Sequence, residues 1–189
     1  MAAGNEDVGN EEKKKSFAGI PEAAFVDDVD TFMTLSENNN NVEVVLKRLD
    51  EQHSKYKFME LNLLAKRRRL KSQVPDLEHS QLMINLLKKQ RESPKDIETQ
   101  FLLSEQVFMK ALVPPTDKVC LWLGANIMLE YTLDDASSLL KKNIDTAKKH
   151  LAYVEHDLDF LRDQLTTTEV NMARVYNWDV KRRQAAKSQ

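Results

Sequence analysis

The stretch that decides the fold is LKKNIDTAKKHLAYVEHDLDFLRDQLTTTEVNMARV, residues 140–175. Apolar residues recur along it at alternating steps of three and four, and only Thr168 in the series is polar. Such a repeat places one apolar stripe along a long helix, which packs lengthwise against another helix. The stripe consists of Leu140, Ile144, Ala147, Leu151, Val154, Leu158, Leu161, Leu165, Thr168, Met172 and Val175.

A partner helix is predicted over residues 42–92. An apolar ladder with a step of seven residues runs through it, formed by Val42, Leu49, Tyr56, Leu63, Leu70, Leu77 and Ile84. Pro75 lies inside the ladder and is expected to kink the helix without ending it, because the phase is the same on both sides. The second helix is predicted over residues 134–183, with Thr132 and Asp135 forming a capping box at its start.

Between the two helices, over residues 93–133, the apolar residues alternate instead of following a helical period. Gly124 and the Pro114-Pro115 pair interrupt this segment, and the short alternating runs predict two β-hairpins. Four short strands leave open edges and an apolar face, which are liabilities unless another chain covers them. We therefore predict an oligomerisation hub; the alternative is a small cap on the helix ends of a monomer. The predicted hub residues are Phe101, Leu103, Val107, Met109, Val119, Leu121, Leu123, Ile127, Leu129 and Tyr131.

These elements predict a mainly α fold with a small β insert, in which two β-hairpins join the helices of a long antiparallel coiled-coil hairpin. Charge supports one antiparallel register, because opposite charges then face each other at four places. These are 88–91 with 134–135, 76–78 with 148–149, 66–69 with 155–159, and Glu43 with 181–183. Exposed pairs contribute only about 0.2–1 kcal/mol each, so they select the register more than they stabilise the fold.

The end of the hairpin away from the β insert is the second candidate site. Apolar residues from both helices meet there: Val42, Val45, Leu46, Leu49, Met172, Val175, Tyr176 and Trp178. They could form the end of the coiled-coil core with an aromatic clasp, as favoured for Leu49, Met172 and Val175. They could also form a partly exposed apolar tip that grips a partner. For Val45, Tyr176 and Trp178 the two interpretations are equally supported.

The N-terminal region differs in composition from the rest. Residues 1–41 contain nine acidic residues against three lysines. We expect residues 1–18 to be a disordered acidic extension, and residues 19–41 to hold a short helix between Ile20 and Leu35 followed by a linker. The asparagines at 38–41 can cap the helix that follows. The extension could shield the tip or simply add solubility. Residues 184–189 are expected to be a C-terminal tail.

Composition excludes several classes of protein. The chain has 189 residues, 4 Gly, 5 Pro and a formal net charge of −2, which disfavours a loop-rich fold and a general nucleic-acid or membrane binder. Cys120 is the single cysteine, which fits a reducing compartment, and we expect a cytoplasmic location with the nucleus left open. No secretory signal or membrane span is expected. The histidines and Cys120 do not form a metal or nucleophile pattern, so neither an enzyme nor a cofactor site is expected.

Several stretches resemble the α-type subunits of the prefoldin family. The strongest are VCLWLGANIMLEY at residues 119–131 and EVNMARVYNWDVKRR at 169–183, with GIPEAAFVDDVD at 19–30 and KYKFMELNL at 55–63. The resemblance extends over residues 19–183. It implies a heterohexamer of this chain, one further α-type subunit and four β-type subunits, in which the hairpins form a double β-barrel hub. It also implies that the coiled-coil tips hold unfolded actin and tubulin and pass them, without nucleotide, to the cytosolic group II chaperonin.

Two alternatives come from other classes. The basic run KRRRLK at residues 66–71 could belong to an RNA-binding coiled-coil arm, which predicts RNA affinity that falls steeply with salt. Facing acidic residues explain the run more simply, so no nucleic-acid partner is expected. The other alternative is a scaffold or adaptor coiled coil without chaperone activity.

Overall fold

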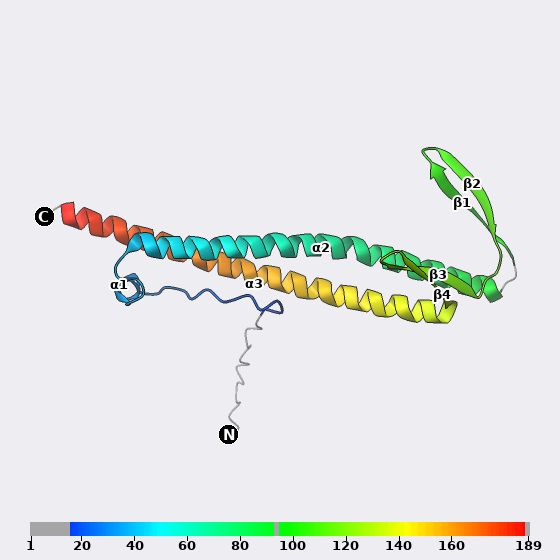
Figure 1. Ribbon diagram of the computed structural model, residues 1–189, viewed down its shortest axis with the longest axis horizontal. Helices are drawn as coiled ribbons and strands as arrows, with labels where there is room; N and C mark the ends of the chain where they lie inside the picture. Colours follow the sequence, from blue (N-terminus) through cyan, green and yellow to red (C-terminus); the bar gives the residue numbers. More distant parts are fainter. Residues whose placement is uncertain (1–15, 93–94, 188–189) are drawn as a thin grey trace, which may run out of the picture. The chain divides into compact units, whose positions relative to one another are not determined.

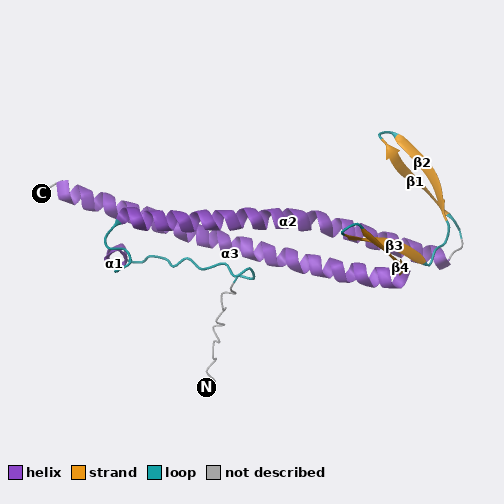
Figure 2. Cartoon of the chain, in the orientation of Figure 1, coloured by secondary structure: helices purple, strands orange, loops and turns teal. Residues whose placement is uncertain are grey.

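The computed structural model describes residues 16–92 and 95–187 and contains two long helices with two β-hairpins between them (Figures 1 and 2). This element order confirms the predicted fold class. Most of the expected acidic extension, residues 1–15, lies outside the described residues. The elements are α1 (Val29–Thr34), α2 (Val42–Glu92), β1 (Ile97–Ser104), β2 (Val107–Val113), β3 (Lys118–Gly124), β4 (Ile127–Thr132) and α3 (Leu133–Lys187).

The chain forms two compact units. The terminal unit comprises residues 1–66 and 153–189, and the central unit comprises residues 67–152. Each contains one part of α2 and one part of α3, so each has its own helix pair and its own core. No described helix has a stretch that is both long and apolar enough to span a bilayer.

In the central unit, α2 and α3 pack in antiparallel orientation around a small apolar core. Its buried residues are Ile84, Leu133, Ala136 and Leu140. Two of the four expected charge matches are ion pairs here: Lys88 lies 2.7 Å from Asp134, and Lys148 lies 2.7 Å from Glu78. The helix α2 continues through Pro75.

In the terminal unit, the expected charge match at the end of α3 is wrong. Arg182 and Arg183 do not pair with Glu43 but with Asp179, at 3.3 and 2.7 Å. Asp179 lies three and four residues before the two arginines, which places all three side chains on neighbouring positions of one helix. A local partner of this kind needs no particular register with α2, so it competes well with a partner on the other helix.

The hairpins form two separate two-stranded antiparallel sheets, β1–β2 and β3–β4. The turns at residues 105–106 and 125–126 are two residues long. Gln106, Ala125 and Asn126 have φ values of 65°, 49° and 60°, which is the left-handed conformation that tight hairpin turns require. Gly124, with φ of 92°, precedes the second turn, where the register also shifts. The two loops therefore lie where the alternating pattern is interrupted.

Side chains cap both long helices at their first turns. The Asn41 Oδ1 atom accepts the N–H groups of Glu43 and Val44, so the asparagine run caps α2. Asn39 and Asn40, with φ values of 43° and 53°, make the bend that precedes the cap, in a conformation that asparagine tolerates better than most residues. At α3, Thr132 accepts the N–H of Asp135 at 3.1 Å and donates its hydroxyl to the Asp135 carboxylate at 2.7 Å.

The helix expected between Ile20 and Leu35 is much shorter than predicted. Only Val29–Thr34 is helical, and the chain before it is extended. Asp28 caps this short helix by accepting the N–H of Asp30 at 3.0 Å. The extended conformation of residues 20–27 has a physical cause: side chains of α2 and α3 bond their backbone groups, in place of the bonds that a helix would make internally.

Candidate functional site

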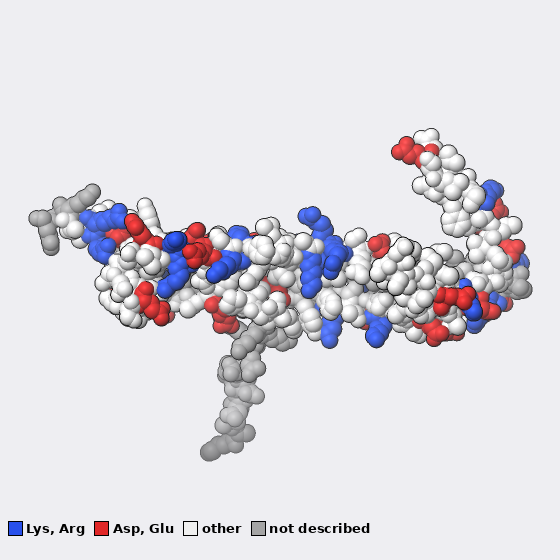
Figure 3. Space-filling view, in the orientation of Figure 1, with Lys and Arg blue, Asp and Glu red and all other residues white. Residues whose placement is uncertain are grey.

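The β1–β2 hairpin exposes apolar side chains on both of its faces. Phe101 pairs with Met109 and Leu102 pairs with Phe108, and successive residues of a strand point to opposite faces. All four side chains are exposed. The visible face of the hairpin carries few charged side chains (Figure 3). The predicted hub residues of this hairpin are all exposed, namely Phe101, Leu103, Val107 and Met109.

The β3–β4 hairpin has one face against the core of the central unit. Val119, Leu121 and Tyr131 are half-buried and pack on the cluster that contains Leu133 and Ala136. The remaining predicted hub residues, Leu123, Ile127 and Leu129, are exposed. The opposite face carries the exposed pair Trp122 and Met128, which the hub prediction had not included.

Apolar exposure on this scale is unusual for a chain that works alone. A two-stranded sheet has an unpaired edge on each side, and both hairpins combine such edges with uncovered aromatic and aliphatic side chains. Within the described residues, seven of the ten expected hub residues therefore lie on surface that suits contact with other chains. The contact itself stays a prediction.

The predicted tip lies in the terminal unit and is more covered than expected. Val42, Val45, Leu49 and Val175 are buried in one cluster with Met33 of α1. Their burial agrees with the core interpretation, and it is completed by the N-terminal segment, which folds back and places the fully buried Met33 over them. The sequence pattern alone had correctly favoured a core role for Leu49 and Val175. Binding of a client by these residues stays a prediction.

One side of the tip remains open. Leu46 and Met172 are half-buried at the edge of the tip cluster, and Tyr176 is 60% exposed. With Lys47 and Asp50 they line a shallow apolar groove between the two helices. Trp178, the last predicted tip residue, packs against the cluster instead, and its Nε1–H donates to Asp30 at 2.5 Å. Trp178 therefore has the role of the aromatic clasp, whereas Tyr176 is part of the exposed apolar surface.

A strap, defined here as residues 16–28, runs along α3 in the terminal unit (Figure 1). Three buried polar residues of α3 hold it: Asp157, Gln164 and Asn171. Asp157 accepts the N–H groups of Phe17 and Ala18 at 2.7 and 2.9 Å, and Gln164 accepts that of Ala23 at 2.8 Å. Asn171 accepts the N–H of Val26 at 2.9 Å and donates to the carbonyl of Ala24 at 2.8 Å.

The sequence analysis missed these three residues, although the sequence contains a signal for them. They are spaced by seven residues and lie directly beside the apolar stripe. A solvated helix face needs no such regular repeat of one kind of side chain. Amide and carboxylate groups repeated at that interval, next to a core, indicate a second segment that needs hydrogen-bond partners. Asp157, which the charge pattern had assigned to the match with residues 66–69, accepts strap N–H groups with both of its oxygens.

Apolar and aromatic contacts complete the docking of the strap. Ile20 is buried in a cluster with Tyr56, Leu161 and Leu165. The Tyr56 hydroxyl also donates to the carbonyl of Pro21 at 2.8 Å. Phe17 stacks on another aromatic ring of α3 with its centroid 4.0 Å away. These contacts tie the strap to both helices.

Comparison with known proteins identifies the family. A family model described as prefoldin subunit matches residues 56–178. The chain belongs to the prefoldin family. Prefoldin subunit 3 of Drosophila melanogaster is 65% identical over 175 residues, covering 93% of this chain and 88% of the relative. Prefoldin subunit 3 of Homo sapiens is 57% identical, with 97% and 89% covered, and that of Saccharomyces cerevisiae is 39% identical, with 92% and 90% covered.

A solved structure gives a weaker likeness. A chain of filamentous PFD from Methanocaldococcus jannaschii is 19% identical with a TM-score of 0.48, and the likeness covers 62% of this chain and 94% of that one. Membership of the prefoldin family makes the chain a non-enzymatic component of a chaperone that acts in protein folding. Other prefoldin subunits are its partners.

The pKa values of three charged side chains are shifted by neighbouring hydrogen-bond donors or by an ion-pair partner. The Thr31 hydroxyl and the Asp30 N–H donate to Asp28 and hold the pKa of that carboxyl below its usual value. The ammonium of Lys88 lowers the pKa of Asp134, and Glu78 raises the pKa of its partner Lys148. Within residues 16–92 and 95–187, no group of three or more His, Cys, Asp or Glu side chains is arranged to hold a metal ion.

Proposed function

We propose that the chain is one of two α-type subunits in a heterohexamer with four β-type subunits, and that it holds unfolded polypeptide at the end of its helix pair. The clients include actin and tubulin, and the receiver is the cytosolic group II chaperonin. No nucleotide takes part. The site of action is the cytoplasm, with the nucleus as a further location.

The observation that carries the holding function is the open groove at Leu46, Met172 and Tyr176. It remains open where the neighbouring apolar residues of the tip are covered by α1. A methionine and an aromatic ring adapt to many apolar partners, which suits clients without a fixed structure. One groove of this size buries little area, so useful affinity requires several such sites on one frame, acting through effective concentration.

The assembly is supported by the two hairpins. Their exposed apolar faces and open edges need partners throughout the life of the protein. The test is native mass spectrometry of the tagged chain purified from its own cells. A discrete complex of six different subunits, with this chain present once, is expected. A monomer or dimer that carries RNA, or a complex with a single adaptor partner, would contradict the chaperone proposal.

The client groove has its own test. Tyr176→Ser, assembled into the hexamer, is expected to suppress the aggregation of denatured actin less well than the unmodified hexamer. Asn177→Ser is the matched control, because Asn177 is the exposed neighbour on the same helix. Equal suppression by the two variants would rule out Tyr176 as a client contact.

A further inference from the structure

The strap and the row Asp157, Gln164 and Asn171 have a feature that the proposed function does not use. Every hydrogen bond that this row makes with the strap goes to a backbone N–H or C=O group. The hydrogen bonds from other positions of the two long helices follow the same rule. Tyr56 donates to the carbonyl of Pro21, and Arg174 donates to that of Asp27 at 2.6 Å. Since all polypeptides share this backbone, these hydrogen bonds do not depend on a particular strap sequence.

The spacing of Gln164 and Asn171 matches the repeat of an extended chain, whereas Asp157 binds the turn at Phe17 and Ala18. Residues seven apart on a helix are separated by about 10.5 Å along its axis. Three residues of extended chain span about 10 Å. Ala23 and Val26, which bind Gln164 and Asn171, are three residues apart. The match therefore comes from helix and strand geometry, and another extended segment can reproduce it.

Side chains add a modest apolar requirement. The strap inserts Ile20 and Val26, both buried, while Glu22, Phe25 and Asp27 are exposed. An occupant therefore needs two apolar residues about six positions apart, a pair that most unfolded protein chains contain. The hydrogen bonds provide affinity and the apolar positions provide selectivity, as in other forms of main-chain recognition.

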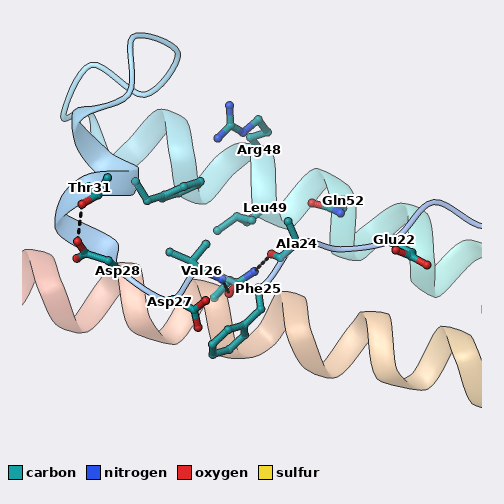
Figure 4. Close-up of a pocket in the computed structure, with 12 residues that line it drawn as sticks. Glu22, Ala24, Phe25, Val26, Asp27, Asp28, Thr31, Arg48, Leu49 and Gln52 are labelled. Atoms are coloured by element: carbon teal, nitrogen blue, oxygen red, sulfur yellow. Dashed lines mark hydrogen bonds between the residues drawn. The ribbon is translucent and has the colours of Figure 1, made fainter. Parts of the chain in front are cut away.

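The strap fills its site incompletely. An open hollow lies between the strap and α2, lined by Phe25, Arg48, Leu49 and Gln52 among others (Figure 4). A second hollow lies on the α3 side, against Phe160 and Thr167. The strap continues directly into α1, whose Met33 covers the tip cluster. Release of the strap would therefore loosen the cover over the apolar residues from which the client site was predicted.

We propose that Gln164 and Asn171 form a main-chain-binding site for an extended segment of unfolded polypeptide, and that residues 16–28, anchored at their first turn by Asp157, occupy this site until such a segment displaces them. The inference deepens the proposed holding function and rests on it. The strap is then an intramolecular competitor that occupies the client's binding site. The apparent affinity for a client is reduced by the fraction of time for which the strap is docked.

The test uses the complete hexamer and a fluorescent, permanently unfolded probe, reduced and carboxymethylated α-lactalbumin. The strap is released by Ile20→Ser with Val26→Ser, which leaves α3 unchanged. Its matched control is Glu22→Ser with Asp27→Ser, on exposed positions of the strap. We expect the released hexamer to bind the probe about tenfold more tightly than the control. Gln164→Leu with Asn171→Leu, added to the released hexamer, should remove this gain. Native mass spectrometry and circular dichroism verify assembly and helix content.

A second measurement needs no variant. Saturating probe on the wild-type hexamer should accelerate amide hydrogen exchange at Ala23 and Val26 and leave the β3–β4 amides unchanged. If the probe binds while these strap amides keep their protection and the released hexamer binds no more tightly than the control, the strap site is refuted and the holding function stands. If the probe binds neither the wild-type nor the released hexamer, the proposed function is refuted, and this inference with it.

Discussion

Replacement of Asn171 by leucine should detach the strap and leave the helix pair intact. The two side chains are of similar size, so packing changes little. The variant leaves the N–H of Val26 without its acceptor at 2.9 Å and the carbonyl of Ala24 without its donor at 2.8 Å. An unsatisfied buried group costs about 1–3 kcal/mol, and a lost, partly exposed hydrogen bond costs about 0.5–1.5 kcal/mol.

For Asn171→Leu, which loses two hydrogen bonds, the smaller cost of about 0.5–1.5 kcal/mol for each lost bond is the better estimate. Val26 and Asn171 both line the open hollow beside the strap, so water can reach the orphaned groups after a small shift. A net cost of about 2 kcal/mol raises the opening equilibrium of the strap roughly thirtyfold, since about 1.4 kcal/mol corresponds to a factor of ten. The seam residues Leu161, Leu165 and Val175 are not touched by the change, and their buried contacts should persist.

Amide hydrogen exchange measures this equilibrium directly. In Asn171→Leu, the amides of Ala23 and Val26 should exchange roughly thirtyfold faster than in the wild type, and the amides of α3 at the seam should exchange at unchanged rates. Asn177→Leu, on an exposed position of the same helix, is the control and should change neither set. Less than about threefold acceleration at Val26, with the seam still protected, would show that Asn171 does not hold the strap. Equal acceleration of strap and seam would show that the two unfold together.

Three further outcomes follow from the contacts above. Phe108→Asp places a charge on an exposed apolar face of β1–β2 and should prevent entry into the hexamer, whereas Gln100→Asp on the same hairpin should not; native mass spectrometry distinguishes them. Thr31→Val removes the main donor to Asp28 and should raise the pKa of that carboxyl, measured by NMR titration. Because the folded pKa of Asp28 is lowered, its support of α1 is present above the unfolded pKa and is lost as the pH falls through the folded pKa. Thr132→Ala removes the cap of α3 and should cost about 1 kcal/mol in thermal unfolding experiments.

The long helices and the hairpins could be predicted because each has a periodic signal that depends on its own residues. An apolar step of three and four fixes α3, and alternating residues around Gly124 fix β3 and β4. Thr132 could be identified as a cap because its hydroxyl and the Asp135 carboxylate act within one turn. Such signals are local, so one sequence is enough to show them.

The strap could not be predicted because its conformation is decided by residues about 140 positions away. Ile20, Val26 and Met33 are spaced by six and seven, which is compatible with scattered positions on a helix. Only the acceptors on α3, such as Gln164, make the extended form favourable. The contribution of Met33 to the tip cluster was missed for the same reason, because its contact with Val45 depends on how the strap docks.

The two kinds of apolar surface in this chain differ in how they can be used. The hairpins expose aromatic and aliphatic side chains at open sheet edges, where lasting exposure favours aggregation, so a permanent partner is the only safe cover. In the terminal unit the chain supplies a cover of its own, held by hydrogen bonds to backbone groups and by few buried side chains. A cover that is held by contacts common to all polypeptides can be exchanged for another polypeptide at little net cost in hydrogen bonds. The proposed division, with permanent assembly in one unit and exchangeable binding in the other, rests on where each unit places its apolar side chains and its buried amides.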